Sequence, residues 1–352
     1  MPGRWEGPWE GPWEGRLEKW RDLLFNPYLL PVARPYSITV ETINTCNAKC
    51  IFCPYPYNIS ARERGVMSMP LFRKVVDDYA EWGGGNLCLT PITGEILIDK
   101  HLEERIDYAR SLSPIKTIEF YTNGLLLDGD RLENLFARGV TRLFISVAGH
   151  DRESYRQLMG VDRFQRFCAN LEAIHATALR LGRLTSVTIA VRTQLELESY
   201  RQTTFYREHL QRFPQVDLIN RFSTWGNSIE LARLPIPLTA ASLGEEHRHR
   251  MQRLKCPCAI HYGVSGGMMI TWNGVVSYCG CRDFMGNTDL VIGDASRESL
   301  VDIWKSPAKK RIVAGFERGE PPLFCQQCDK YTPMTRMNRL QRIRRLLGRG
   351  GW

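Results

Sequence analysis

Strand-like and helix-like segments alternate along the chain from Tyr36 to Trp225, and this alternation restricts the possible folds more than any other feature. β-Branched segments with alternating apolar residues predict strands, and apolar residues at helical spacing predict helices. Strands joined in this way through helices are parallel and follow right-handed crossovers. We predict strands at residues 36–44, 86–92, 115–124, 141–149, 185–194 and 216–223, and helices at 69–82, 101–112, 129–139, 162–182 and 198–213.

Six strand–helix units are fewer than the eight that close a full barrel. The predicted fold class is therefore α/β, with an open, partial (βα)6 barrel of the TIM type followed by a small cysteine-rich domain. In barrel-like α/β folds, ligands bind at the carboxyl ends of the strands. We expect the functional residues of this chain to lie at that edge.

The chain divides into five predicted segments. Trp5, Trp9 and Trp13 recur in a Gly- and Pro-rich repeat that precludes regular structure at the N-terminus. The C-terminal tail has apolar residues at helical spacing, which indicates a solvated helix or, alternatively, a segment that contacts a membrane surface or RNA. The segments are an irregular arm (1–35), the barrel (36–225), a linker (226–255), the cysteine-rich domain (256–332) and the basic tail (333–352).

Charge and hydropathy limit the possible partners. The net charge is +9, but six arginines of the tail supply most of it, so the rest of the chain carries only +3. We therefore expect no nucleic-acid partner. No apolar run reaches the ~18 residues that a membrane span requires, and the N-terminus lacks the apolar core of a signal peptide. These features predict a cytoplasmic protein.

Nine of the eleven cysteines fall into two groups, and only Cys88 and Cys168 stand apart. Disulfides are rare in a reducing cytoplasm, so a metal or redox role is expected. The first group, Cys46, Cys50 and Cys53, follows the first predicted strand. A structural zinc site has four ligands, whereas soft thiolates also suit iron–sulfur clusters. A zinc site that borrows a distant ligand is the alternative.

The Cys-x3-Cys-x2-Cys spacing after a first strand resembles the signature of the radical S-adenosylmethionine (radical SAM) enzymes over residues 36–225. The resemblance implies that Cys46, Cys50 and Cys53 hold a 4Fe–4S cluster, with S-adenosylmethionine completing the coordination of the remaining iron. Reductive cleavage of S-adenosylmethionine would then yield a 5′-deoxyadenosyl radical that removes a hydrogen atom from substrate. An electron donor such as flavodoxin or ferredoxin is implied as a partner.

The same resemblance implies roles for further residues. Gly94 and Glu95 stand where the family places a Gly-Glu pair that receives the methionine amino group, although Ile96 replaces the usual proline. Phe52 stands where backbone atoms contact the adenine. The other expected cofactor contacts are Thr122 and Asn123 at the third strand, Ser146 at the fourth, and Arg192 at the fifth, the last as a partner for the methionine carboxylate.

The second cysteine group resembles the SPASM/twitch auxiliary-cluster module over residues 256–331, including an Asn-Gly hairpin. No cysteine follows Cys328, which favours the twitch form with one auxiliary 4Fe–4S cluster. A four-cysteine zinc site is the alternative. Cys256 and Cys281 are then spare, and either could donate a hydrogen atom to a substrate radical. The expected ligands are Cys258, Cys279, Cys325 and Cys328.

Three functions remain open from the sequence. The first is oxidation or epimerisation of a small polyol, sugar or aminocyclitol. The second is maturation of a ribosomally made peptide, which the 35 residues before the first strand disfavour, since many peptide-modifying relatives carry a larger binding segment there. The third is an iron–sulfur electron carrier or sensor, against which Glu95 and the intact cysteine triad argue.

Overall fold

The computed structural model describes residues 34–35, 37–58, 61–235, 255, 258, 267–279 and 283–331. Six strands pair in parallel, as predicted, and their order is β6-β5-β4-β3-β2-β1. The strands are β1 (Ser37–Val40), β2 (Gly85–Cys88), β3 (Ile115–Thr122), β4 (Arg142–Ala148), β5 (Val187–Arg192) and β6 (Val216–Ile219). The helices between them are α2 (Met69–Glu81), α3 (Leu102–Ser111), α4 (Gly129–Ala137), α5 (Arg152–Met159), α6 (Phe164–Arg180) and α7 (Leu197–Arg201).

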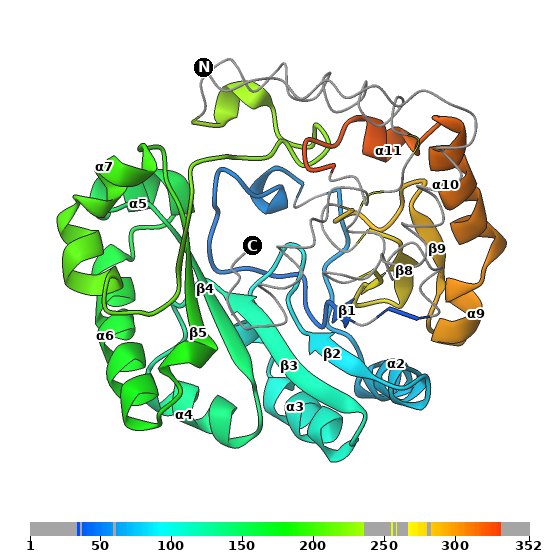
Figure 1. Ribbon diagram of the computed structural model, residues 1–352, viewed down its shortest axis with the longest axis horizontal. Helices are drawn as coiled ribbons and strands as arrows, with labels where there is room; N and C mark the ends of the chain where they lie inside the picture. Colours follow the sequence, from blue (N-terminus) through cyan, green and yellow to red (C-terminus); the bar gives the residue numbers. More distant parts are fainter. Residues whose placement is uncertain are drawn as a thin grey trace, which may run out of the picture. The chain divides into compact units, whose positions relative to one another are not determined.

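The two faces of this sheet differ in polarity. The outer face packs against the helices, which lie outside the arc of strands in Figure 1, and is apolar. The inner face carries polar side chains at the alternate positions. Parallel strands that are buried on both faces are usually apolar throughout, so the polar face is expected to meet polar ligands. Outer-face residues include Ile38, Leu87, Phe120, Ile145 and Ile189, and inner-face residues include Thr39, Cys88, Glu119, Ser146 and Asp217.

The C-terminal module extends the core sheet. Its strands are β7 (Met269–Ile270), β8 (Val275–Ser277) and β9 (Val291–Asp294), and β7 pairs in parallel with β1. β7 and β8 form the predicted hairpin, whose turn contains Gly274 at φ +96°. The sequence predicted the hairpin but not its pairing with β1. The helices α9 (Leu300–Trp304), α10 (Pro307–Arg318) and α11 (Leu323–Gln326) follow.

Two segments differ from the predicted helices. The helix α5 forms within the predicted loop after β4, because Asp151 and Ser154 make a reciprocal capping box at its start. The helix expected over residues 198–213 ends at Arg201, and a separate π-helical turn covers Tyr206–Leu210. The Thr203 hydroxyl between them donates to a backbone carbonyl and accepts from a backbone amide, which competes with helical hydrogen bonds.

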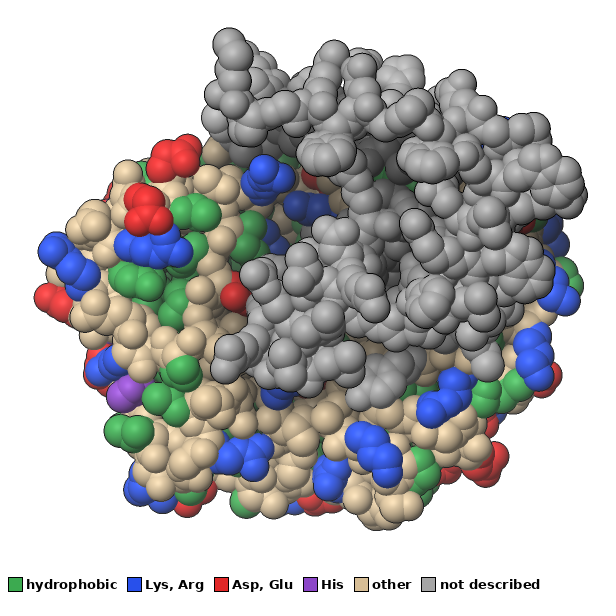
Figure 2. Space-filling view, viewed as in Figure 1, with side chains coloured by type: hydrophobic (Ala, Val, Ile, Leu, Met, Phe, Trp, Pro, Cys, Tyr) green, Lys and Arg blue, Asp and Glu red, His purple; other side chains and the backbone are tan. Residues whose placement is uncertain are grey.

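Some predictions concern residues outside those that the structure describes. They are the tryptophan-rich arm, most of the linker, the amphipathic tail, and the spare residues Cys256 and Cys281. Within the described ranges, no helix has the length and apolarity needed to cross a bilayer. On the face shown in Figure 2, basic and acidic side chains are interspersed over the described surface.

A buried ion pair holds the loop between β2 and α3. The Arg105 guanidinium donates from Nε to Asp99 Oδ2 at 2.9 Å, and both side chains are fully buried. Arg105 Nη2 donates to the Met67 carbonyl, and the Arg105 guanidinium lies over the Phe72 ring, 5.0 Å from the ring centroid. Because Asp99 follows Glu95 on the same loop, the pair helps to position Glu95.

Arg105→Met is expected to lower the free energy of unfolding by about 3–5 kcal/mol, because the Asp99 carboxylate is left buried without its partner. Denaturant titration measures the change. The double variant Arg105→Met/Asp99→Leu removes both charges and is expected to recover most of the loss. Equal losses in the single and double variants would show that the unpaired charge is not the cause.

Candidate active site

The loop that carries the first three cysteines is fastened to the end of α5. The Lys49 and Ile51 amides each donate to a backbone carbonyl there, those of Met159 and Leu158, both at 3.0 Å. Gly160 closes α5 with φ +67°, and a Cβ at this position would lie 2.2 Å from the Lys49 carbonyl oxygen. Only glycine therefore allows the loop to approach this closely.

The three thiols of this loop lie close enough to affect one another. Burial, together with negative charge on Glu95 and Cys53, raises the pKa of Cys46 to about 12. Burial also raises the pKa of Cys50 well above its ordinary value. Negative charge on Cys53 and Cys46 adds to this rise, and the positive charge of Arg192 opposes it. Such thiols ionise when a metal replaces their protons. The donor set thus fits a thiolate-bound metal group.

The number and softness of these donors favour a cluster over a structural zinc ion. A structural zinc site has four ligands, whereas three soft thiolates suit an iron–sulfur cluster with one iron left for another ligand. We therefore assign Cys46, Cys50 and Cys53 to a cluster, as a proposal.

The loop after β2 lies against the start of the cysteine loop. A Cβ on Gly94 would lie 2.9 Å from the Ile43 carbonyl oxygen, so a larger residue would push the two loops apart. The Glu95 amide then donates to the Thr45 carbonyl at 2.9 Å, immediately before Cys46. Gly94 and Glu95 thus join the ends of β1 and β2.

The Glu95 carboxylate is buried and accepts three hydrogen bonds from protein donors. One oxygen accepts from the Thr122 hydroxyl at 2.7 Å and the Leu97 amide at 3.1 Å. The other accepts from the Asn123 amide at 2.7 Å. The Asn123 side chain in turn donates to Asn47 Oδ1 at 2.6 Å, inside the cysteine loop. The structure thus brings Glu95, Thr122 and Asn123 together as a support for that loop.

Glu95→Ala is expected to weaken S-adenosylmethionine binding and to lower the free energy of unfolding by about 2–3 kcal/mol, since each buried donor left unpaired costs about 1–3 kcal/mol. Calorimetric titration and denaturant unfolding of the reconstituted protein measure the two effects. Glu198→Gln, at an exposed site on α7, serves as the control. Wild-type affinity and stability in Glu95→Ala would contradict both roles.

Phe52 is held by residues that follow β6, which the sequence did not single out. Its carbonyl accepts from the Trp225 indole at 2.9 Å, and its ring lies 5.7 Å from that of Phe222. The Arg192 guanidinium lies over the Phe52 ring at 5.5 Å. Trp225 has φ 53°, an uncommon conformation for an aromatic residue. The only sequence signal for Trp225 was its position just past the last core strand.

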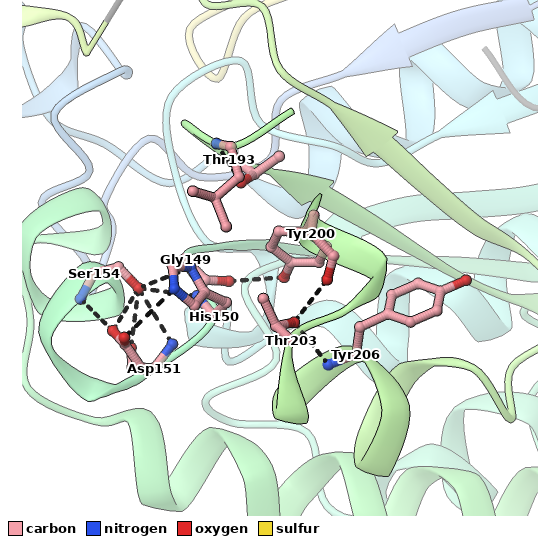
Figure 3. Close-up of polar contacts among 9 residues, drawn as sticks. Gly149, His150, Asp151, Ser154, Thr193, Tyr200, Thr203 and Tyr206 are labelled. Carbon is pink, nitrogen blue, oxygen red and sulfur yellow. Dashed lines mark hydrogen bonds and ion pairs between the residues drawn. The ribbon is translucent and has the colours of Figure 1, made fainter. Parts of the chain in front are cut away.

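The carboxyl ends of β4 and β5 are tied together through Tyr200 (Figure 3). Its hydroxyl donates to the Gly149 carbonyl at 2.8 Å, and the Gly149 amide donates to the Arg192 carbonyl at 3.2 Å. Thr203 donates to the Tyr200 carbonyl at 2.7 Å. These contacts fix the strand ends that carry Ser146 and Arg192. Ser146 is half-buried on the inner face, and its hydroxyl has no partner among the described residues.

The C-terminal module also gathers thiols. Burial raises the pKa of Cys325 well above its ordinary value, and charge on Cys279, Cys328 and Cys258 raises it further. These are the four cysteines that the sequence predicted as auxiliary ligands, and the structure brings them together. Asp289 accepts hydrogen bonds from two backbone amides at the start of α11, which carries Cys325. This second thiolate set fits a metal cluster as the first does.

The module is joined to the barrel by Asp329, which directly follows Cys328. Its carboxylate accepts from the Ser223 hydroxyl at 2.7 Å and from the Thr224 amide at 3.1 Å, both just past β6. The second thiolate set is therefore connected to the segment that supports Phe52.

Comparison with known families identifies this arrangement. The sequence matches the family model of the Radical SAM superfamily over residues 40–196, and that of an iron–sulfur cluster-binding domain, SPASM, over residues 258–329. The chain is a radical SAM enzyme. The recognition made from the cysteine spacing is thus confirmed. So are its cofactors: a 4Fe–4S cluster, S-adenosylmethionine and an auxiliary cluster.

Curated relatives of this radical SAM enzyme include two GTP 3′,8-cyclases. Those of Stenotrophomonas maltophilia and Synechococcus elongatus are 29% and 26% identical over 154 and 145 residues. These matches cover 44% and 41% of this chain. They cover 46% and 43% of the relatives, so the chain spans less than half of the length of either.

Solved structures resemble this radical SAM enzyme over more of its length. BtrN in complex with AdoMet and 2-DOIA has a TM-score of 0.59 at 18% identity, covering 86% of this chain and 95% of BtrN. Streptococcus suis SuiB bound to precursor peptide SuiA has a TM-score of 0.58 at 13% identity, covering 95% and 80%. The structure of anSMEcpe with AdoMet and a peptide has a TM-score of 0.57 at 14% identity, covering 81% of this chain and 84% of anSMEcpe. At these identities the likeness shows the fold alone.

Proposed function

We propose that this radical SAM enzyme abstracts a hydrogen atom from a small polyol, sugar or aminocyclitol, which it oxidises or epimerises. The polar inner face of the barrel is the observation that carries the proposal. On that face, towards the carboxyl ends of β4 and β6, the side chains of Ser146 and Asp217 have no hydrogen-bond partner among the described residues. A polyhydroxylated substrate offers the donors and acceptors that such a surface requires.

Each proposed site residue has a defined task. Cys46, Cys50 and Cys53 would hold the first cluster, and Cys258, Cys279, Cys325 and Cys328 the second. Once reduced, the first cluster would give one electron to S-adenosylmethionine to yield a 5′-deoxyadenosyl radical and methionine, and the second would accept one electron from the substrate radical. Glu95, Thr122 and Asn123 keep the cysteine loop in place.

Two further residues would orient S-adenosylmethionine. Arg192 can pair with the methionine carboxylate, since a guanidinium suits a planar carboxylate. Ser146, with a free hydroxyl on the same inner face, can donate to the ribose. Phe52 would lie beside the adenine, with its carbonyl already occupied on one side by Trp225.

Peptide modification is the second candidate. The fold likeness to SuiB and anSMEcpe, whose structures contain peptides, is nearly as close as that to BtrN. A panel of cyclitols, hexoses and short peptides separates the candidates when each is incubated anaerobically with S-adenosylmethionine and a reductant. We expect small polyols to stimulate 5′-deoxyadenosine formation. Stimulation by peptides alone would favour the second candidate, and no 5′-deoxyadenosine at all would indicate an electron carrier or sensor.

Turnover in deuterated water is expected to distinguish epimerisation from oxidation. A thiol exchanges its proton with solvent, so epimerisation would place deuterium on carbon, which mass spectrometry of the product detects. In that case Cys281→Ala is expected to divert the reaction towards an oxidised product or to stall it, with both clusters retained; Cys256→Ala is the comparison. Product without solvent deuterium, and wild-type behaviour of both variants, would contradict a cysteine donor and favour oxidation.

A further inference from the structure

One row of inner-face residues crosses three neighbouring strands near their carboxyl ends. Ser146 on β4 pairs in register with Ala190 on β5, and Ala190 pairs with Asp217 on β6. Two of the three side chains are small. Tyr121 and Phe144 stack one pleat below the row, with ring centroids 4.5 Å apart. The row is thus the inner-face layer next to these two rings, on the side of the carboxyl ends.

Asp217 lies on the inner face of the barrel. Its neighbours Val216 and Leu218 pack against the hydrophobic core on the outer face, which turns the Asp217 side chain inward. Burial raises the pKa of Asp217. Burial raises the pKa of Tyr121, and negative charge on Cys88, Glu119 and Asp217 raises it further. The Asp217 carboxylate therefore lies near the Tyr121 hydroxyl. Asp217 has no hydrogen bond or ion pair with any described residue.

Two other carboxylates on this side of the sheet have cationic partners. Glu41 on the segment after β1 pairs with Arg62, and Glu119 pairs with Arg142 at 2.5 Å. The buried Glu95 carboxylate accepts three hydrogen bonds instead. Asp217 differs from all three, since it has neither an ion pair nor a hydrogen bond among the described residues. A half-buried carboxylate without a partner is costly, and a charge-assisted hydrogen bond from a ligand removes that cost.

We propose that Asp217 binds the ammonium group of an amine-bearing polyol, with the Tyr121 hydroxyl available for a ring hydroxyl. A neutral hydroxyl could donate to the same carboxylate, but it would leave the negative charge uncompensated. An ammonium group supplies both the donor and the opposite charge. The inference rests on the proposed function and narrows its substrate class from polyols in general to aminated ones.

Matched pairs of ligands test the inference. The probes are scyllo-inositol with 1-amino-1-deoxy-scyllo-inositol, and D-glucose with D-glucosamine, titrated calorimetrically into the reconstituted protein with S-adenosylmethionine present. At least one amine is expected to bind about tenfold or more tightly than its hydroxyl partner, because losing one partner of a charge pair costs well over 1.4 kcal/mol. Asp217→Asn is expected to abolish this preference, with unchanged iron content and S-adenosylmethionine affinity.

Asp130→Asn, at an exposed site on α4, is the matched control and is expected to keep the preference. Equal binding of the amine and hydroxyl forms, no binding of any amine, or an unchanged preference in Asp217→Asn would overturn the inference. Oxidation or epimerisation of neutral polyols without an amine preference would overturn it while leaving the proposed function intact. Conversely, an Asp217-dependent amine that binds but is never converted would support the inference and count against the proposed reaction.

Discussion

Replacing Cys46, Cys50 and Cys53 together by alanine is expected to lower the iron content of the anaerobically reconstituted protein from about eight to about four atoms per chain, and to abolish 5′-deoxyadenosine formation. The reason is that the three thiols lie on one loop, close enough to raise one another's pKa, so the variant removes the whole donor set of the first cluster. Metal analysis and chromatographic detection of 5′-deoxyadenosine measure the two effects.

Cys168→Ala is the control for this triple variant. Cys168 lies on α6, outside both thiolate sets, and its replacement is expected to leave iron and 5′-deoxyadenosine formation unchanged. A wild-type protein that holds about four irons and one zinc would contradict the auxiliary cluster instead, since it would place a zinc ion in the second set.

Replacing Cys258, Cys279 and Cys325 together by alanine is expected to remove about four irons while 5′-deoxyadenosine formation continues. The hydrogen bonds that hold the first loop to the end of α5 and to Asn123 do not involve the second set, so the variant leaves them in place. Conversion of substrate to an oxidised product is expected to stop, because the electron acceptor is lost. Electron paramagnetic resonance of the reduced protein should then show one cluster signal in place of two.

The spare cysteines provide the matched control for this second variant. Cys256→Ala and Cys281→Ala are expected to keep the wild-type iron content, because the predicted ligand set does not include them. A loss of about four irons in either single variant would show that the ligand set was misassigned. Loss of 5′-deoxyadenosine formation in the Cys258/Cys279/Cys325 variant would show that the two sites are not independent.

Much of the fold could be predicted because it depends on local patterns. Apolar residues of period two and of helical spacing located the six core strands and most of the helices. The prediction failed over residues 198–213, where the Thr203 hydroxyl takes backbone hydrogen bonds from the helix. A side-chain bond of this kind depends on one rotamer, which hydrophobic periodicity does not record.

The cysteine sets could be predicted from their spacing, whereas their surroundings could not. The sequence singled out Glu95, Thr122 and Asn123 as separate cofactor contacts. Only the structure shows that one buried carboxylate joins them and that the Asn123 side chain reaches Asn47 in the cysteine loop. Trp225 was missed because its contact with Phe52 joins residues more than 170 positions apart.

The sequence by itself determined the parallel α/β architecture, the membership of the radical SAM family, and the chemistry of the two thiolate sets. These follow from periodicity, residue type and short spacings, which act within a few residues of one another. The tertiary structure alone decided that β7 extends the core sheet beside β1, that Glu95 serves as a support, and that Asp217 faces the barrel without an ion pair among the described residues. Those outcomes depend on which residues far apart in the sequence meet after the chain has folded. No local sequence pattern encodes those contacts.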